Sequence, residues 1–536
     1  MKQLVPLVVG LLALPAAAAS AGRYIVALRP VAGRPAEARR EGARELPAIN
    51  GFAAELSDAE VAALRRSKNV RFVEPVVERH LLDLAPHTTA GPLSRSQSIP
   101  YGIDLIHARD VWPYSRGANV NIVVVDTGIT PNHPDLGASG TDGFNVQTHT
   151  GDVVDDHGHG THVAGTIGAL DNTLGVVGVA PAARIWSVKA LDAGGNGTNE
   201  DVVAAIDWIL ARKQELGGNW IVSMSLGSTL ASRAEDEAFA RLRDADVLTV
   251  AAAGNSGYLA LDYPAAYASV LSVGAIDAVR TTAWFSSGGG TLGVMAPGVE
   301  VLSTAPMASV PSSAATRGST RASGVPFQQA ARGDATGGVA LCGFGGPGDC
   351  GDAKGKIALI TRGNGLYFAE KVRNAIADGA IAAVIVNYDD TPLFIGSLIR
   401  PVCDENYTCV PSQDDINFKW PPVTLVRKSD GDKLANQTGT ITLNIWDDDY
   451  AVRSGTSMAA PHVAGVAALL WSLAPSAHAI DIRRAIELTA QDLGPKGFDP
   501  ANGNGLIDAL AAAKFIAPGA FGLPAPPPAH RRSVGH

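Results

Sequence analysis

Residues 219–227, NWIVSMSLG, and residues 246–255, DVLTVAAAGN, decide the fold. Each is a β-rich apolar run that ends in a glycine or a polar residue, and NIVVVD at residues 121–126 follows the same pattern. Short continuous apolar runs are typical of strands that are buried on both faces of a parallel sheet. Helix-like sequence alternates with these runs from Tyr101 onward. The pattern predicts an α/β domain with a mostly parallel sheet and helices on both faces, whose function gathers at the carboxyl ends of the strands.

The length and charge of the chain limit its organisation and its partners. It has 536 residues and a formal net charge of -9 at pH 7. At roughly 150 residues per domain, this length predicts three or four domains. The net negative charge gives no indication of a basic surface that would bind the phosphate backbone of nucleic acid, so nucleic acid is not an expected partner. We expect a monomer.

The N-terminus has the parts of a secretory signal. Lys2 precedes an apolar run at residues 4–14, and a small-residue stretch offers cleavage after Ala19 or Ala21. An uncleaved membrane anchor is the alternative, but Pro15 and the alanine-rich end favour cleavage. No later segment is expected to form a stable membrane span. The protein is therefore expected to be secreted to the extracellular space, with the periplasm or the cell surface as alternatives.

All four cysteines lie in one short region, and none has zinc-site spacing from a histidine. Disulfides are the better interpretation, and they need an oxidising compartment. Four cysteines allow three pairings. The two local pairs, Cys342 with Cys350 and Cys403 with Cys409, close the smallest loops and so have the least entropic cost.

Changes in pattern divide the chain into segments. A strand-like run, capping-box spacing at Ser57 and Glu60, and a second strand mark a small unit that is marginal alone. The predicted segments are a signal peptide at residues 1–21, this α+β unit at 22–80, a linker at 81–95, the first part of the α/β domain at 96–306, an insertion at 307–450, the second part at 451–516, and a Pro-rich disordered tail at 517–536.

Three histidines lie within six positions of DDHGHGTHVAGT, at His157, His159 and His162. One interpretation is a metal cluster, but an HExxH pattern is absent and no carboxylate or cysteine is placed to complete a zinc site. The alternative is a general base, with one imidazole facing the rim of the sheet and another turned into the core.

Three other residues add chemistry, although each has an ordinary interpretation. Asp126 ends a buried strand, Asn255 ends another, and Ser457 precedes a long apolar helix. Such residues are commonly caps or turn residues. A serine at a helix N-terminus is also placed to act as a nucleophile, because backbone N–H groups and the helix dipole stabilise an oxyanion. With a histidine, these residues supply acid, base, amide donor and nucleophile in the order Asp, His, Asn, Ser.

The strings DTGI, HGTHVAGT, SMSLG, AAAGN and GTSMAAPHVAG resemble, in this order, the motifs of the subtilisin-like serine proteases. The resemblance implies a three-layer subtilisin-like fold and a secreted endopeptidase of broad specificity that is made as an autoprocessed zymogen. It makes Ser457 the nucleophile, His159 the general base, Asp126 the acid that orients the imidazole, and Asn255 the oxyanion donor. His157 takes no assigned role, and His162 is expected to pack inward.

The same resemblance implies how protein or peptide substrates bind. They would add as a strand to two edges. Small residues beside one edge leave room for a large side chain, and no acidic cluster is evident there, so strict basic-residue specificity is not expected. The substrate-binding positions are Gly195, Asn196 and Gly197 on one edge, and Ser225, Leu226 and Gly227 on the other, which walls the first specificity pocket with Ala253 and Gly254.

A structural Ca²⁺ also follows from the resemblance, because six positions agree with an all-oxygen shell. The alternative is that Asn172 makes a turn and Asp135 caps a helix. The side-chain ligands would come from Gln97, Asp135 and Asn172, and the backbone carbonyls from Leu170, Leu174 and Val176.

Two further segments resemble known companions of the protease domain. The unit at residues 22–80 is similar to the subtilase propeptide, an inhibitor and intramolecular chaperone, in YIVAL, INGFAAEL and VRFVEP. This implies autocatalytic maturation in the linker, and register with the family places the cut after Arg95. The insertion resembles a protease-associated domain in GKIALITRG and GAIAAVIVNY. Such a domain would gate substrates or mediate contacts, and a passive spacer is the alternative.

Two other functions compete with an endopeptidase. The first is a catalytically dead fold that binds partners through the insertion, which the intact set of acid, base, nucleophile and amide disfavours. The second is a serine hydrolase that does not act on peptides. The edge segments and the propeptide-like unit disfavour it, because both address extended peptides.

Overall fold

The computed structural model describes residues 21–30, 33, 35–82, 84, 97–391, 393, 396–404 and 408–523. Residues 1–20 of the expected signal peptide, most of the expected linker and the end of the tail lie outside the described residues, while Ala21 is the first residue of β1. The chain divides into two compact units, Met1–Val77 and Glu78–His536, and each is described by itself.

The first unit is a small antiparallel sheet with one helix. Its strand order is β2-β3-β1-β4. Ser57 and Glu60 form the predicted capping box, in which the Ser57 N–H donates to the Glu60 carboxylate at 2.8 Å. Apolar residues of the sheet and helix enclose a core of their own. The elements are β1 (Ala21–Leu28), η1 (Ala36–Arg39), β2 (Arg44–Leu46), η2 (Pro47–Ile49), β3 (Gly51–Ser57), α1 (Asp58–Arg66) and β4 (Val70–Pro75).

The second unit is built on a seven-stranded sheet in which every pairing is parallel, as the apolar runs predicted. Its order is β14-β13-β12-β10-β6-β8-β7. Both faces are buried, since all residues of β12 and β13 are inaccessible to solvent or nearly so. The strands are β6 (Val120–Asp126), β7 (Gly143–Asn145), β8 (Arg184–Lys189), β10 (Asn219–Met224), β12 (Val247–Ala252), β13 (Val270–Ile276) and β14 (Val294–Pro297).

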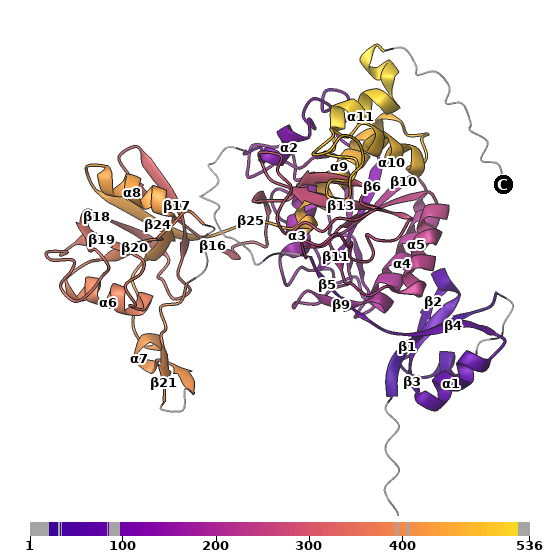
Figure 1. Ribbon diagram of the computed structural model, residues 1–536, viewed down its shortest axis with the longest axis horizontal. Helices are drawn as coiled ribbons and strands as arrows, with labels where there is room; N and C mark the ends of the chain where they lie inside the picture. Colours follow the sequence, from indigo (N-terminus) through magenta and orange to yellow (C-terminus); the bar gives the residue numbers. More distant parts are fainter. Residues whose placement is uncertain are drawn as a thin grey trace, which may run out of the picture. The chain divides into compact units, whose positions relative to one another are not determined.

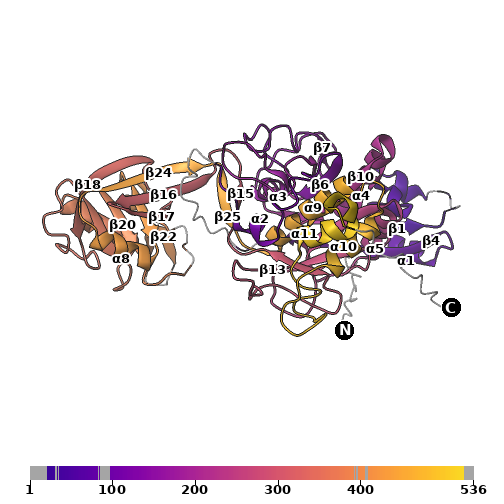
Figure 2. The same ribbon diagram turned by 90° about the horizontal axis from the view of Figure 1, so that it is seen from above.

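Helices cover both faces of this sheet and make the expected three layers (Figures 1 and 2). Helices α4 and α5 contact each other on one side, and α3 contacts α9 on the other. Helix α9 also contacts five strands of the sheet and is the central core helix. The helices of this unit outside the insertion are α2 (Tyr101–Leu105), α3 (His159–Gly168), α4 (Asn199–Leu216), α5 (Arg233–Asp244), α9 (Thr456–Leu473), α10 (Ala479–Leu488), α11 (Ala509–Ile516) and η3 (Pro518–Phe521).

Among the described residues, α9 alone has the length and mean hydropathy of a membrane-spanning helix, which differs from the expectation that no such segment follows the leader. Its most apolar window is 89% buried inside the protein. A helix that is apolar on all sides is the expected form of a core helix. Helix α9 therefore has the composition of a membrane span because the sheet and the neighbouring helices enclose it on all sides.

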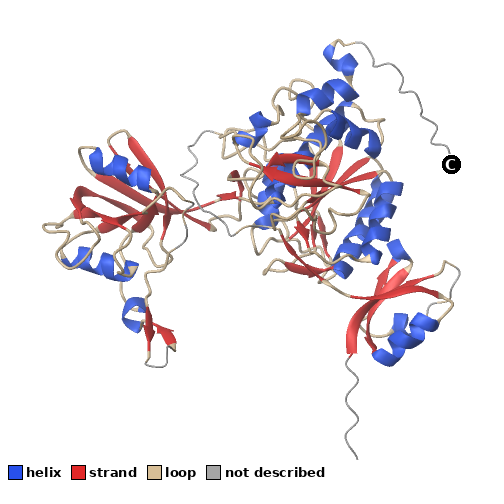
Figure 3. Cartoon of the chain, in the orientation of Figure 1, coloured by secondary structure: helices blue, strands red, loops and turns tan. Residues whose placement is uncertain are grey.

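The insertion forms a closed barrel with strand order β16-β17-β23-β20-β19-β18-β24 (Figure 3). The chain enters after β15 (Val301–Thr304) and returns in β25 (Tyr450–Arg453), and these strands pair antiparallel. The barrel strands are β16 (Val310–Arg317), β17 (Thr320–Pro326), β18 (Gly333–Leu341), β19 (Lys356–Thr361), β20 (Ala382–Val386), β23 (Val423–Val426) and β24 (Ile441–Asp448). The other elements are α6 (Phe368–Ala377), β21 (Pro401–Cys403), β22 (Cys409–Pro411), α7 (Gln413–Ile416) and α8 (Lys428–Asn436).

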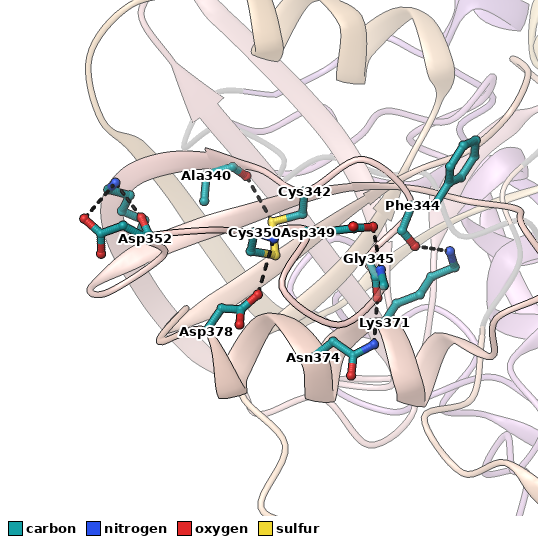
Figure 4. Close-up of a disulfide and its surroundings, with 12 residues drawn as sticks. Ala340, Cys342, Phe344, Gly345, Asp349, Cys350, Asp352, Lys371, Asn374 and Asp378 are labelled. Carbon is teal, nitrogen blue, oxygen red and sulfur yellow. Dashed lines mark hydrogen bonds and ion pairs between the residues drawn. A yellow bond between two sulfur atoms is a disulfide. The ribbon is translucent and has the colours of Figure 1, made fainter.

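Both predicted local disulfides are present in the insertion, Cys342–Cys350 and Cys403–Cys409. Figure 4 shows the first of them beside α6. Asn374 on that helix donates to the Gly345 carbonyl at 2.9 Å, and the buried Lys371 donates to the Phe344 carbonyl. The loop between the two cysteines is therefore held by hydrogen bonds to α6 as well as by the disulfide.

The N-terminus of α3 lies so close to the end of β6 that only glycine fits at its second residue. A Cβ at Gly160 would lie 2.1 Å from the Gly128 carbonyl oxygen. We predict that Gly160→Ala lowers the free energy of unfolding by about 1–3 kcal/mol, because the helix must move away from the strand. Thermal unfolding of Gly160→Ala beside Gly151→Ala checks this, since a Cβ at exposed Gly151 meets no heavy atom within 4 Å. Equal melting temperatures would refute the close packing.

Candidate active site

An aspartate and a histidine form a buried pair at the carboxyl edge of the sheet. Asp126 is the last residue of β6 and His159 is the first residue of α3. The His159 Nδ1 donates to Asp126 Oδ1 at 2.8 Å and lies 3.0 Å from Oδ2. The Thr127 N–H donates to the same Oδ1 at 2.8 Å. This carboxylate fixes the imidazole with Nδ1 protonated, which leaves Nε2 as the basic nitrogen.

Ser457 and Asn255 meet on a single carbonyl group, that of Leu82. Ser457 is the second residue of α9, and its Oγ donates a hydrogen bond to the Leu82 oxygen. The Asn255 Nδ2 donates to the same oxygen at 2.7 Å. The Asn255 Oδ1 in turn accepts from the N–H and the hydroxyl of Thr456, both at 2.9 Å, so the amide orientation is fixed. A peptide carbonyl of the chain itself thus lies between the serine and an amide donor.

The segment that carries Leu82 lies between the two predicted edges. Strand β5 (Glu78–Leu81) pairs antiparallel with β9 (Asn196–Thr198) on one side and with β11 (Leu226–Gly227) on the other. Further backbone hydrogen bonds join Leu81 N to Gly195 O at 3.1 Å and Leu82 N to Ser225 O at 3.3 Å. Beyond Leu82, the Leu84 N–H donates to the Ser454 carbonyl at 3.1 Å. The structure brings both predicted edges onto one extended strand.

The Leu82 side chain faces the small residues predicted to wall a pocket. A Cβ at Gly227 would lie 3.0 Å from Leu82 Cδ1 and 3.3 Å from Asp262 Cβ, and a Cβ at Gly254 would lie 2.5 Å from Asp262 Oδ2. Ala253 adjoins them, because its carbonyl accepts from the Asp262 N–H at 2.9 Å. Asp262 is buried, and burial raises the pKa of its carboxyl above the usual value.

Sequence reasoning missed two buried carboxylates beside this strand, Asp262 and Glu235. Glu235 on α5 forms a bidentate ion pair with Arg79 of β5, with N–O distances of 2.9 and 2.7 Å. The spacing of Ser232 and Glu235 is that of a helix cap, which explains why it gave no functional signal. Asp262 precedes a turn and carried no pattern at all. Only the folded chain places either of them next to the bound strand.

The other two histidines of the DDHGHGTHVAGT segment, His157 and His162, are not part of the Asp126–His159 pair. His162 is fully buried, its Nε2 donates to the Val301 carbonyl at 3.0 Å, and burial holds its pKa well below the usual value. The expectation that it packs inward is confirmed. His157 is half-buried, and its ring centre lies 6.4 Å from that of His159. Burial, the Arg453 charge and the neighbouring His159 lower its pKa. Within the described part of the chain, no group of three or more His, Cys, Asp or Glu residues is arranged to hold a metal.

The residues expected to hold calcium come from three segments that hydrogen-bond to one another, namely Gln97, Asp135 and residues 170–176, and their oxygen chemistry fits a hard cation. Asp135 accepts from Asn172 Nδ2 at 2.8 Å and from Val176 N at 2.7 Å. The Gln97 side-chain amide contacts two carbonyls, Leu170 O at 2.7 Å and Val176 O at 3.2 Å. If the amide group were turned by 180°, Oε1 would take the place of Nε2 and would face the same region as these two carbonyl oxygens. Leu174, the sixth expected residue, donates its backbone N–H to Asn172 Oδ1 at 2.6 Å.

Comparisons with known proteins agree with this geometry. The model of the subtilase family matches residues 117–328 and 353–505, more than half of the chain, and that of the peptidase inhibitor I9 family matches residues 43–82. Subtilisin DY of Bacillus licheniformis is 44% identical over 220 residues, which are 39% of this chain and 76% of that protein. Subtilisin E of Bacillus subtilis is 38% identical over 263 residues, 48% of this chain and 64% of the relative.

A solved structure is also similar over most of its length. The psychrophilic subtilisin-like protease Apa1 from the Antarctic psychrotroph Pseudoalteromonas sp. AS-11 aligns with a TM-score of 0.59 and 31% identity. The alignment covers 81% of this chain and all of that structure. Since the family model spans the strands and helices that carry Asp126, His159, Asn255 and Ser457, the chain belongs to the subtilase family and is a subtilisin-like serine peptidase.

Proposed function

We propose that this protein is a secreted serine endopeptidase that is made as a zymogen and first cleaves its own chain between Leu82 and Asp83. The observation that carries the proposal is the Leu82 carbonyl, which accepts hydrogen bonds from both Ser457 and Asn255. Strand β5 approaches as a substrate strand would, paired with both edges. The leader pattern and the two disulfides support secretion.

The geometry supports the standard two-step acyl transfer. His159 Nε2 takes the proton of the Ser457 hydroxyl, and Oγ adds to the carbonyl carbon of Leu82. Asn255 Nδ2 stabilises the resulting oxyanion, and in subtilisin one such donor is worth roughly 3–4 kcal/mol of barrier. The proton then passes from His159 to the departing amine of Asp83. A water molecule then attacks the ester between Ser457 and Leu82 in the same series of steps. Throughout, Asp126 holds the imidazole and stabilises its charged form.

The hydrogen bonds of the Leu82 carbonyl support a first cut at a bond earlier than the one expected after Arg95. The inhibitor I9 match also ends at residue 82. The cut expected after Arg95 lies outside the described residues, and it stays a prediction for a later trimming step. In this scheme the first cleavage separates the inhibitor-like unit, and trimming of residues 83–95 gives the final N-terminus near Ser96.

We predict that Ser457→Ala abolishes both casein hydrolysis and release of the N-terminal unit, because one nucleophile serves both reactions. In subtilisin, loss of this hydroxyl lowers kcat by about 10⁶. N-terminal sequencing of the wild type at early times should find a chain that begins at Asp83. Ser472→Ala, on the same helix but near its other end, should process normally. Processing of Ser457→Ala at the wild-type rate would disprove the proposed role of Ser457.

We also propose that Asp262 sets a pH-dependent preference for the residue before the scissile bond. Below its raised pKa the carboxyl is neutral and suits an apolar side chain such as that of Leu82. Above that pKa the buried anion favours a cationic partner in addition to the Arg79 charge, which already opposes the effect of burial on its pKa, because a buried charge is costly unless it is paired. The pocket would therefore accept leucine at all pH values but discriminate in favour of lysine or arginine only once Asp262 has ionised.

The ratio of kcat/KM for lysine over leucine at this position should accordingly rise with pH, with a midpoint above the usual aspartate pKa of about 3.9. Peptide substrates that differ in this one residue, assayed across the acidic to neutral range, measure the ratio. Asp262→Asn should make the ratio independent of pH. A flat profile for the wild type would show that Asp262 does not face the substrate side chain.

We also propose a structural calcium ion between three segments, with ligands from Gln97, Asp135, Leu170, Asn172, Leu174 and Val176. The bound ion would neutralise the buried Asp135 and tie Gln97 to the loop that follows α3. Its contribution is to rigidity, and no step of the reaction passes through it.

Removal of calcium with a chelator should lower the melting temperature, since at about 100 times its Kd an ion adds about 2.7 kcal/mol of stability. Asp135→Asn should melt at the same temperature with and without calcium. Asp236→Asn, which changes an exposed carboxylate of α5 in the same unit, should keep the wild-type response. A calcium response that persists in Asp135→Asn would place the ion elsewhere.

We propose that the inserted barrel is a protease-associated domain that gates access of protein substrates. The support is its closed barrel and its attachment through the β15–β25 pair, whose second strand leads directly to Ser454 and Ser457. An ion pair between Arg427 of the barrel and Glu300, with an N–O distance of 3.0 Å, adds a second contact to the catalytic domain.

A further inference from the structure

The fourth residue on the amino side of the proposed scissile bond is Arg79, and its side chain is entirely buried. Its exposed fraction is 0%, as is that of its partner Glu235. The guanidinium Nε lies 2.9 Å from Oε1 and one terminal nitrogen lies 2.7 Å from Oε2, while the other terminal nitrogen donates to the Glu78 carbonyl at 2.8 Å. Every nitrogen of the guanidinium thus has an acceptor.

The carboxylate of Glu235 is positioned by the catalytic unit and not only by Arg79. The Tyr267 hydroxyl lies 3.0 Å from Oε2, and it is itself held by the backbone of Ser232, whose carbonyl and N–H lie at 2.8 and 2.9 Å. Burial raises the pKa of Tyr267, which keeps the hydroxyl neutral. The N-cap hydroxyl of Ser232 accepts from the Glu235 N–H at 3.2 Å and fixes the first turn of α5.

This arrangement discriminates between side chains of similar size. A planar guanidinium matches both oxygens of a carboxylate, whereas a lysine ammonium presents only a point charge. A neutral side chain would leave Glu235 buried without a cation, and that loss exceeds the modest net value of the ion pair itself. Specificity of this kind arises mainly from the penalty on wrong residues.

We propose that Glu235 forms a subsite that selects arginine at the fourth residue before the scissile bond, in substrates as well as in the propeptide strand. The inference rests on the proposed endopeptidase function. Its basis is that Glu235, Tyr267 and Ser232 all belong to the catalytic domain, so the pocket stays in place when residues 78–82 leave. An incoming substrate strand that pairs with β9 and β11 in the same register brings its own fourth residue to this carboxylate.

The test uses two fluorogenic peptides, Arg-His-Leu-Leu and citrulline-His-Leu-Leu, each with a coumarin amide after the last leucine. Citrulline keeps the shape of arginine and removes the charge. With mature wild-type enzyme, kcat/KM should fall on the order of 100-fold for the citrulline peptide, as expected when one partner of a buried charged pair is lost. Glu235→Gln should remove most of this difference. Asp236→Asn, which removes a neighbouring exposed carboxylate of α5, should preserve it.

Equal rates for the two peptides with the wild type would overturn the proposal, and this comparison needs no variant to fold. The same would follow if Glu235→Gln kept the full preference for arginine. Casein hydrolysis by the same preparation distinguishes failure of the arginine subsite from failure of the endopeptidase function. If casein is cleaved while the peptides react equally, the endopeptidase function stands and the arginine subsite falls. If mature enzyme cleaves neither casein nor the peptides, both proposals fall.

Discussion

The close packing of α3 against α9, and of both against the sheet, is the constraint on which the rest of the catalytic unit depends. Both helices begin at the carboxyl edge of the sheet, one with His159 and the other with Ser457 beside its first residue. Small residues let the backbones approach. A Cβ at Gly165 would lie 2.2 Å from the Thr304 hydroxyl, and one at Gly465 would lie 2.5 Å from Val179 Cβ. A larger residue at Gly165 would push α3 away from β15, and one at Gly465 would push α9 away from Val179 and from the Ile167 carbonyl of α3.

That packing also explains why α9 is so apolar. Its N-terminal half carries the proposed nucleophile Ser457, and the helix contacts the sheet, α3, α10 and α11. A helix surrounded on all sides has no polar face to offer, so its composition resembles that of a membrane span although 89% of its window is buried in protein. The close packing around α9 stabilises the geometry of the candidate active site, because the helix cannot rotate or slide without disrupting that packing.

Much of the fold and part of the candidate site followed from the sequence, for identifiable reasons. Buried strands are visible as continuous apolar runs, and residues at their carboxyl ends must meet at one edge. The sequence pattern alone therefore groups Asp126 and Asn255, and the local disulfides follow from loop length. The family resemblance then supplied roles that no local pattern contains.

Glu235 and Asp262 could not be found in this way. Each acquires its meaning from a strand that lies more than 150 positions earlier in the chain, since Glu235 pairs with Arg79 across 156 residues. A carboxylate three residues after a serine at the start of a helix is typical of a helix cap, and a carboxylate before a turn is typical of a solvent-exposed residue. Burial next to another segment is a property of tertiary structure, and it alone turns these residues into candidates for specificity.

The ion pair of Arg79 and Glu235 also bears on which bond is cut. Side chains alternate between the two faces of a strand. A shift of β5 by one residue would therefore turn Arg79 away from Glu235 and would move all of the strand's side chains to the opposite face. A slip by two would restore the facing but place a different residue at the carboxylate. Only the observed register pairs the guanidinium, and in that register the Leu82 carbonyl lies between Ser457 and Asn255. In the proposed mechanism, the charged contact at Arg79 therefore selects the bond that Ser457 attacks, while the backbone pairing with β9 and β11 stabilises the strand without depending on its sequence.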